Sequence, residues 1–153
     1  MRVDYQSLAD FRYYIRAFLG VREKAARTVG LEPQQYLLLL QLKGLEGRKT
    51  PTIGALAERL HVKHHSAVEL VDRLVARKLV ARRRAHDDRR QVLVELKPAG
   101  KAVLERLARH SLRELQTAGP ALVDVLTRLI ENRGNGPRSP QRSRQAATHG
   151  GTS

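Results

Sequence analysis

Cysteine and tryptophan are both absent from this chain of 153 residues, and aromatic residues make up only 4% of it. Without cysteine there can be no disulfides, no thiolate metal sites and no cysteine-based redox sensing, and the composition is compatible with a reducing cytosol. With so few aromatic side chains, a core has to be built mainly from Leu, Val, Ala and Ile. Apolar residues make up 41% of the chain, and its length is enough to bury such a core.

Long apolar runs are also missing. The longest strongly apolar run, Tyr36 to Leu40, is too short to cross a bilayer, and the N-terminal residues MRVDYQSLAD lack the apolar core of a signal peptide. We therefore expect a cytoplasmic protein with no membrane partner.

The motifs of enzymes and metal sites are absent too. The sequence has no serine elbow, no phosphate-binding glycine loop and no metal-ligand spacing. Adjacent histidines on a predicted helix, His64 and His65, diverge by about 100° and do not favour one shared ion. We expect neither an enzyme nor a bound cofactor or metal.

Acidic residues are scarce relative to basic ones. There are 29 Lys and Arg against 15 Asp and Glu, a formal charge of +14, which favours a polyanionic partner. Residues 73–90 concentrate this charge in eight side chains: Arg73, Arg77, Lys78, Arg82, Arg83, Arg84, Arg89 and Arg90. Such a cluster predicts strong, salt-sensitive attraction to duplex DNA.

The apolar spacing predicts mainly helices. A first helix spans about residues 5–29 and ends at Gly30, and Pro33 suits the first turn of a second, buried helix that carries four consecutive leucines. Residues 44–51 are predicted to be a loop. Pro98 opens a further helix, which we expect to break at Gly119 and Pro120 before a last helix over residues 122–130.

Between these parts, two short helices meet at a sharp turn. Thr52 is the predicted N-cap of the first, and only His61 and Val62 separate it from the second, which spans about residues 63–77. Two alternating segments follow, from Leu79 and over residues 92–96, with the polar stretch 82–90 between them. This order predicts a helix-turn-helix followed by a β-hairpin wing.

The second of these helices carries the predicted base-reading face. With its apolar residues turned inward, His65, Ser66 and Glu69 face outward for base readout, and Lys63 and Arg73 are candidates for phosphate contact. Glu69 either accepts from a cytosine amino group or pairs with Arg73. In the wing, Arg89 or Arg90 is predicted to enter the minor groove, with Asp88 orienting a neighbouring guanidinium. The full predicted DNA-binding set is Lys63, His64, His65, Ser66, Glu69, Arg73, Arg82, Arg83, Arg84, Asp88, Arg89 and Arg90.

On the segments IGALAERL, SAVELVDRLVARKLV and DDRRQVLVELKPAG, the chain resembles the MarR family of bacterial transcriptional regulators, over roughly residues 8–130. The resemblance implies a homodimer with interlocking terminal helices that reads a pseudo-palindromic operator. It also implies repression, or occasionally activation, relieved by a small phenolic or other amphipathic ligand. Arg12, Tyr13, Arg16 and Tyr36 are the candidate ligand residues, and core or interface roles are the alternative for them.

Three lysines depart from the family pattern. Lys78 stands where the family usually has Gly, so either a left-handed lysine costs about 1 kcal/mol or the turn differs. Lys63 and Lys97 replace the usual Ser and Thr caps.

The predicted organisation is one mainly α domain over residues 1–132, followed by a disordered basic tail over residues 133–153. Residues 52–97 form the winged helix-turn-helix, and about 5–50 and 98–132 form dimerisation helices and their support. The terminal helices carry apolar stripes with no obvious partner inside one small module, which independently favours a homodimer.

Two other classes fit the charge less well. A basic RNA- or nucleoid-associated protein without sequence readout is the alternative, but RNA recognition relies on exposed aromatics that the basic region almost lacks. A membrane-surface protein needs a basic amphipathic helix, whereas here the arginines concentrate in a hairpin.

Overall fold

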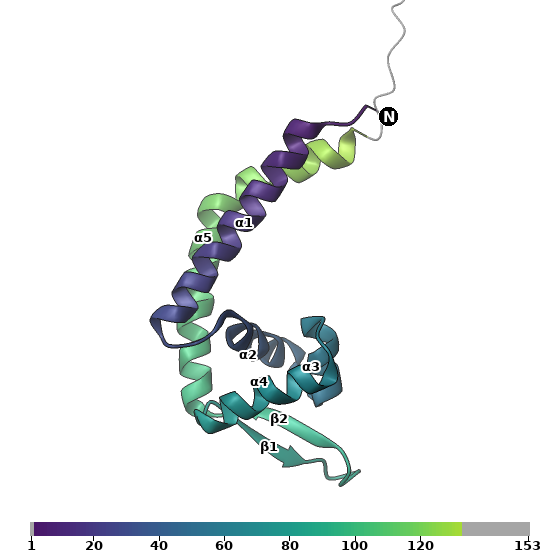
Figure 1. Ribbon diagram of the computed structural model, residues 1–153, viewed down its shortest axis with the longest axis vertical. Helices are drawn as coiled ribbons and strands as arrows, with labels where there is room; N and C mark the ends of the chain where they lie inside the picture. Colours follow the sequence, from purple (N-terminus) through teal and green to yellow (C-terminus); the bar gives the residue numbers. More distant parts are fainter. Residues whose placement is uncertain (1, 133–153) are drawn as a thin grey trace, which may run out of the picture.

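The computed structural model describes residues 2–132 and has the predicted mainly helical architecture (Figure 1). Its elements in chain order are α1 (Tyr5–Thr28), α2 (Pro33–Leu45), α3 (Ile53–Leu60), α4 (His64–Ala76), β1 (Val80–Arg84), β2 (Val92–Leu96) and α5 (Pro98–Glu131). The two strands form one antiparallel hairpin. The predicted tail, residues 133–153, lies outside the described residues.

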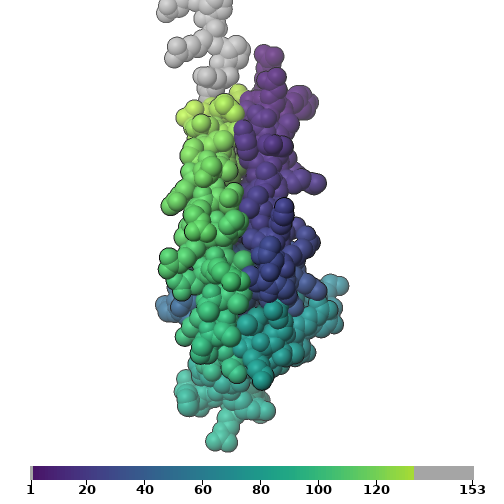
Figure 2. All heavy atoms as spheres, turned by 90° about the vertical axis from the view of Figure 1, so that its left-hand side faces the viewer, coloured from purple at the N-terminus to yellow at the C-terminus, as the bar shows by residue number. Residues whose placement is uncertain are grey.

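α1 and α5 form a long antiparallel pair (Figure 1). α2, α3, α4 and the hairpin lie together at one end of this pair, and we call this part of the molecule the foot. Figure 2 shows the two long helices side by side along the molecule. The expectation that the terminal helices have no partner within one module is therefore wrong, because each packs against the other. The prediction rested on sequence distance, which says nothing about two antiparallel helices that begin and end together.

The predicted break at Gly119 and Pro120 is also wrong, since α5 continues through both residues. Proline removes one helical hydrogen bond, and its ring disfavours a helical conformation in the residue before it, partly through that residue's Cβ. Gly119 has no Cβ, which relieves part of this clash. Packing against α1, with Leu104, Leu107 and Val125 of α5 buried, holds the helix on both sides of the proline.

The core of the foot is centred on α2, as the leucine run predicted. Leu38 and Leu39 are fully buried and pack with Leu56 of α3 and Leu74 of α4. The helix extends to Leu45, one residue past the predicted start of the loop. Thr52 caps α3 as predicted, with its Oγ1 accepting from the Ala55 N–H at 3.1 Å.

Three helices end in the same way, with a left-handed residue after the last turn. Gly30 follows α1 at φ +72°, His61 follows α3 at φ +53°, and Lys78 follows α4 at φ +59°. In each case the next amide reaches back to a carbonyl of the last helical turn, which is the Schellman arrangement. Of the two alternatives for Lys78, the left-handed lysine is confirmed.

The start of α5 lies directly on the backbone that leads into the hairpin. The Lys97 N–H donates to the Leu79 carbonyl at 3.0 Å, and Gly100 is buried against the same residue. A Cβ on Gly100 would fall well inside contact distance of the Leu79 carbonyl oxygen. This contact between two backbones fixes where the long helix leaves the winged module.

Gly100→Ala is expected to lower the free energy of unfolding by about 1–3 kcal/mol, because backbone has to move to admit the methyl group. Gly44→Ala is the matched control: it is helical and has no atom within 4 Å of an added Cβ. It is expected to raise the same quantity by up to about 1 kcal/mol. Urea unfolding followed by circular dichroism measures both, and equal effects would contradict the contact.

Lys78→Gly is expected to raise the free energy of unfolding by about 1 kcal/mol, because glycine removes the Cβ penalty of the left-handed conformation. Lys101→Gly makes the same substitution at an exposed position inside α5 and should lower it by about 1 kcal/mol. Thermal unfolding of the two variants should therefore shift in opposite directions.

Candidate nucleic-acid interface

The helix-turn-helix is formed by α3 and α4. Its turn consists of His61, Val62 and Lys63, and the Val62 N–H closes it by donating to the Ala57 carbonyl at 3.1 Å. On α4, Ala67, Leu70, Val71 and Leu74 are buried, which leaves the opposite face exposed.

The exposed face of α4 carries the predicted base-reading residues. His64, His65 and Glu69 are exposed and Ser66 is half-buried. Lys63 is the N-cap, and its side chain makes no capping hydrogen bond. The first turns of α4 therefore present polar side chains to solvent.

The wing is fixed to the helix-turn-helix from two sides. In its register Val80 pairs with Leu96 and Arg84 with Val92. The Val94 N–H also donates to the Pro51 carbonyl at 2.9 Å, so β2 is bound to the segment that leads into α3. On the other side, Arg82 of β1 forms an ion pair with Asp72 of α4.

The three strand arginines, predicted as one group, have separate partners. Besides the Arg82 pair, Arg83 pairs with Glu95 on β2 at 3.1 Å. Nη1 of Arg84 donates to the Arg89 carbonyl at 2.7 Å and so braces the tip. Because side chains alternate along a strand, Arg82 and Arg84 lie on one face of the hairpin and Arg83 on the other.

The predicted role of Asp88 is wrong in its geometry. Its Oδ1 accepts from the backbone N–H of Arg90 at 2.9 Å rather than from a guanidinium. A short carboxylate reaches the backbone two residues on more easily than a long flexible side chain. Within residues 2–132, the guanidinium groups of Arg89 and Arg90 have no ion-pair partner, so the tip presents both as free cations.

Of the two alternatives for Glu69, the pairing with Arg73 is wrong, because Arg73 has another partner. Nη1 of Arg73 lies 3.2 Å from Oε2 of Glu32, the residue before α2. No local sequence pattern points to this pair, because its members are 41 positions apart. Arg73 is thus directed along the protein surface, and Glu69 has no ion-pair partner within residues 2–132.

A groove of about 400 Å³ separates the helices from the wing. His64, Arg82 and Arg90 line it together with the start of α3. The structure thus brings three members of the predicted DNA-binding set together from α4, β1 and the hairpin loop.

The four candidate ligand residues do not form one cleft. Arg12 and Arg16 line a groove of about 470 Å³ along α1. Tyr13 is 68% exposed and packs edge-on against Tyr14. Tyr36 is buried, with its hydroxyl 3.2 Å from Oγ of Ser111.

Sequence reasoning missed Arg22 beside Tyr36. Its guanidinium lies 5.3 Å from the ring centroids of both Phe18 and Tyr36, and its buried Nε has no hydrogen-bond partner among residues 2–132. Arg22 and Tyr36 border a small cavity between α1 and α2. The helical spacing of Phe18 and Arg22 is a signal that was available in the sequence.

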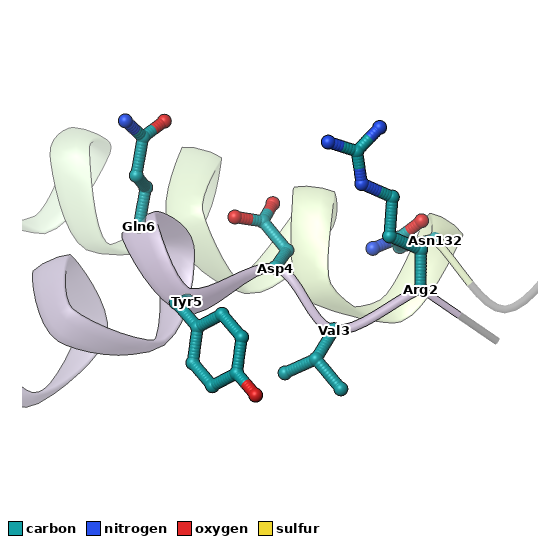
Figure 3. Close-up of a pocket in the computed structure, with 6 residues that line it drawn as sticks. All are labelled: Arg2, Val3, Asp4, Tyr5, Gln6 and Asn132. Atoms are coloured by element: carbon teal, nitrogen blue, oxygen red, sulfur yellow. The ribbon is translucent and has the colours of Figure 1, made fainter.

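A further hollow, of about 460 Å³, lies at the far end of the molecule from the wing (Figure 1), and Figure 3 shows the residues that line it. Arg2, Asp4 and Gln6 line it with Asn132, and it contains none of the predicted site residues. The carboxylate of Asp4 accepts from the Ser7 N–H at 3.0 Å, and this backbone hydrogen bond is the main cause that lowers the pKa of Asp4. Asp4 thereby acts as the N-cap of α1.

None of the helices in residues 2–132 combines the length and the apolar character that crossing a bilayer requires. Within the same residues, no three His, Asp or Glu side chains are grouped so that they could hold a metal ion.

Residues 29–91 match the MarR family, which confirms the sequence resemblance over the segment that holds α2, α3, α4 and β1. A mutant of MepR from Staphylococcus aureus bound to an oligodeoxyribonucleotide has 17% identity and a TM-score of 0.63, over 86% of this chain and 99% of that one. MarR from E. coli in its apo form has 20% identity and a TM-score of 0.65, over 88% and 100%. AbsC, a MarR family regulator from Streptomyces coelicolor, has 20% identity and a TM-score of 0.67, over 88% and 93%. A comparison with curated proteins finds no match.

Proposed function

Since the chain has the DNA-binding fold of MarR-family transcriptional regulators, we propose that it is a sequence-specific duplex-DNA-binding regulator that acts as a homodimer on a pseudo-palindromic operator. The observation that carries this proposal is the joined surface of α4 and the wing. The exposed turn around His65 and the free cations Arg89 and Arg90 belong to elements that the Arg82–Asp72 pair holds together. Such a surface suits a major groove and the minor groove next to it.

In this proposal α4 reads base edges from its first two turns. His65, Ser66 and Glu69 contact bases, and Lys63 and His64 contact phosphates. Glu69 is not held by Arg73, so its carboxylate is available to accept from a cytosine amino group.

The wing supplies the minor-groove contact. Arg90 or Arg89 enters the minor groove, where the negative potential is deepest. Arg82 and Arg84 lie together on one face of the hairpin. Arg83 lies on the opposite face with Glu95, and its contribution is to long-range attraction rather than to direct contact.

The homodimer is supported by where the exposed apolar side chains lie. The large exposed apolar residues of the described chain lie on or next to the two long helices: Val3, Tyr5, Leu8, Tyr13, Leu19, Val21, Leu112, Leu115, Val123, Leu126 and Ile130. A second copy related by a two-fold axis would bury such a surface, and place two α4 helices about one DNA turn apart.

We further propose repression that is relieved by a small aromatic or amphipathic acid. Arg12 and Arg16 offer paired cations along one groove, and the buried Nε of Arg22 next to Tyr36 offers an unused donor. A carboxylate with an apolar body would match either position. A thermal-shift screen of aromatic acids tests this part, and a shift lost in Arg22→Gln would locate the ligand at Tyr36.

Arg90→Ala is expected to weaken binding to operator and random duplexes alike, with a shallower dependence of affinity on salt, because a contact to the phosphate-lined groove is lost. Arg128→Ala removes the same charge at the far end of α5 and should leave both quantities nearly unchanged. Fluorescence anisotropy over a salt series measures them. An unchanged affinity for Arg90→Ala would refute the wing assignment.

His65→Ala and Ser66→Ala are expected to change which sequences are preferred more than they change total affinity, by about 1–3 kcal/mol at the bases they read. Selection from random duplexes gives the preferred motif of each variant, with Arg90→Ala as a control that weakens binding and keeps the motif. If both substitutions return the wild-type motif, α4 does not read bases through these residues. A monomeric protein without duplex preference would refute the proposed function itself.

A further inference from the structure

The C-terminal half of α4 is tied to the α1–α2 junction, by which we mean residues 29–32. Nη1 of Arg77 donates to the Gly30 carbonyl at 2.6 Å, and Nη2 donates to the Val29 carbonyl at 3.4 Å. One turn earlier, Arg73 pairs with Glu32 at 3.2 Å. Arg73 within the candidate recognition helix and Arg77 at its C-cap are thus both directed toward the junction at the end of the long helix α1.

These bonds form at helix ends, where they are favourable. Val29 is the C-cap of α1, and its carbonyl lies at the negative end of the helix dipole, as do the carbonyls at the end of α4 that Arg77 follows. One guanidinium therefore lies between two helix C-termini. Glu32 is itself held in place, because its N–H donates to Oε1 of Gln35 at 3.0 Å.

These hydrogen bonds and the ion pair lie at the opposite end of α4 from the residues proposed to read bases, so a small rotation there displaces the reading end. From Ser66 in the reading turn to Arg77 the helix is roughly 16 Å long, so a rotation of about 10° at the tied end moves the reading end by roughly 3 Å. That displacement is close to the rise of about 3.4 Å per base pair along one DNA strand. The buried face of α4 holds the helix in the fold, and the arginines act on its direction.

We propose that Arg77, together with Arg73, is a positioning residue that sets the distance between the two recognition helices of the homodimer. It does so by fixing α4 to the end of α1, one of the helices that join the protomers. This proposal rests on the proposed function. Selectivity for the spacing of the two half-sites then depends on Arg77, although Arg77 contacts no base. Arg73 is reassigned from phosphate contact to this tie.

The test uses the full chain and a set of duplexes. Each duplex carries the two half-sites that wild-type protein selects from random DNA, with the spacer shortened or lengthened in single base pairs. The variants are Arg77→Gln, Arg77→Lys and Glu32→Gln, and the matched control is Arg59→Gln. Arg59 is likewise an arginine that bonds to a distant segment, through Gln41 of α2 at 2.8 Å, but it lies on α3 away from the junction.

Wild-type protein and Arg59→Gln should lose about tenfold or more in affinity when the spacer changes by one base pair. Arg77→Gln should reduce this loss to about threefold or less, with the half-site motif and the salt dependence unchanged. Arg77→Lys, which keeps the charge but not the two-pronged geometry, should fall between them. Glu32→Gln lies off the reading face and should act in the same direction as Arg77→Gln.

A wild-type spacing profile in both Arg77→Gln and Glu32→Gln would overturn the inference. So would a uniform loss of affinity with a shallower salt slope in Arg77→Gln, since that result identifies a phosphate contact. If Arg77→Gln fails to fold, Glu32→Gln decides the question alone. A wild-type protein that shows no preferred motif would instead count against the proposed function, which the inference presupposes.

Discussion

The backbone of Leu79 is the point on which the rest of the structure depends. Its N–H closes the end of α4 by donating to the Leu74 carbonyl, and its own carbonyl accepts from Lys97 at the start of α5. Gly100 lies against the same carbonyl with no room for a side chain. Three elements therefore take their directions from one residue: the candidate recognition helix, the wing and the long helix that packs on α1. The proposed function needs this rigidity, because base edges are read within hydrogen-bond distance.

Much of the fold was predictable because its signals are local. Thr52, Gly30 and the three residues between α3 and α4 act through backbone conformations that depend on their immediate neighbours. The continuity of α5 was not predictable in this way, because the rule for Pro120 considers only its own helix. Packing against α1, which is far away in the sequence, outweighs the lost hydrogen bond.

The candidate site divides along the same line. Helical periodicity was enough to predict that His65 and Glu69 are exposed and that Leu70 is buried, because the direction of a side chain on a helix follows from its spacing. Pairing was harder to predict, because a long arginine side chain can reach several partners. Arg73 pairs with Glu32 and not with Glu69, which is nearer in the sequence. Arg82 of β1 pairs with Asp72 of α4. Which cations remain free for a polyanion depends on the folded chain.

Lysine occupies three element boundaries, at Lys63, Lys78 and Lys97, where a hydroxyl cap or a glycine would fit the backbone better. Each lysine lowers the free energy of unfolding by about 1 kcal/mol relative to the better-fitting residue. Together they cost a sizeable part of the roughly 5–15 kcal/mol that is the free energy of unfolding of a typical domain. The same three side chains add positive charge around the candidate recognition helix and the wing. If the protein binds duplex DNA as proposed, binding to the folded state would restore part of this stability by mass action. Unbound copies would then be the form more exposed to cellular proteases, so the amount of protein would follow the number of occupied sites.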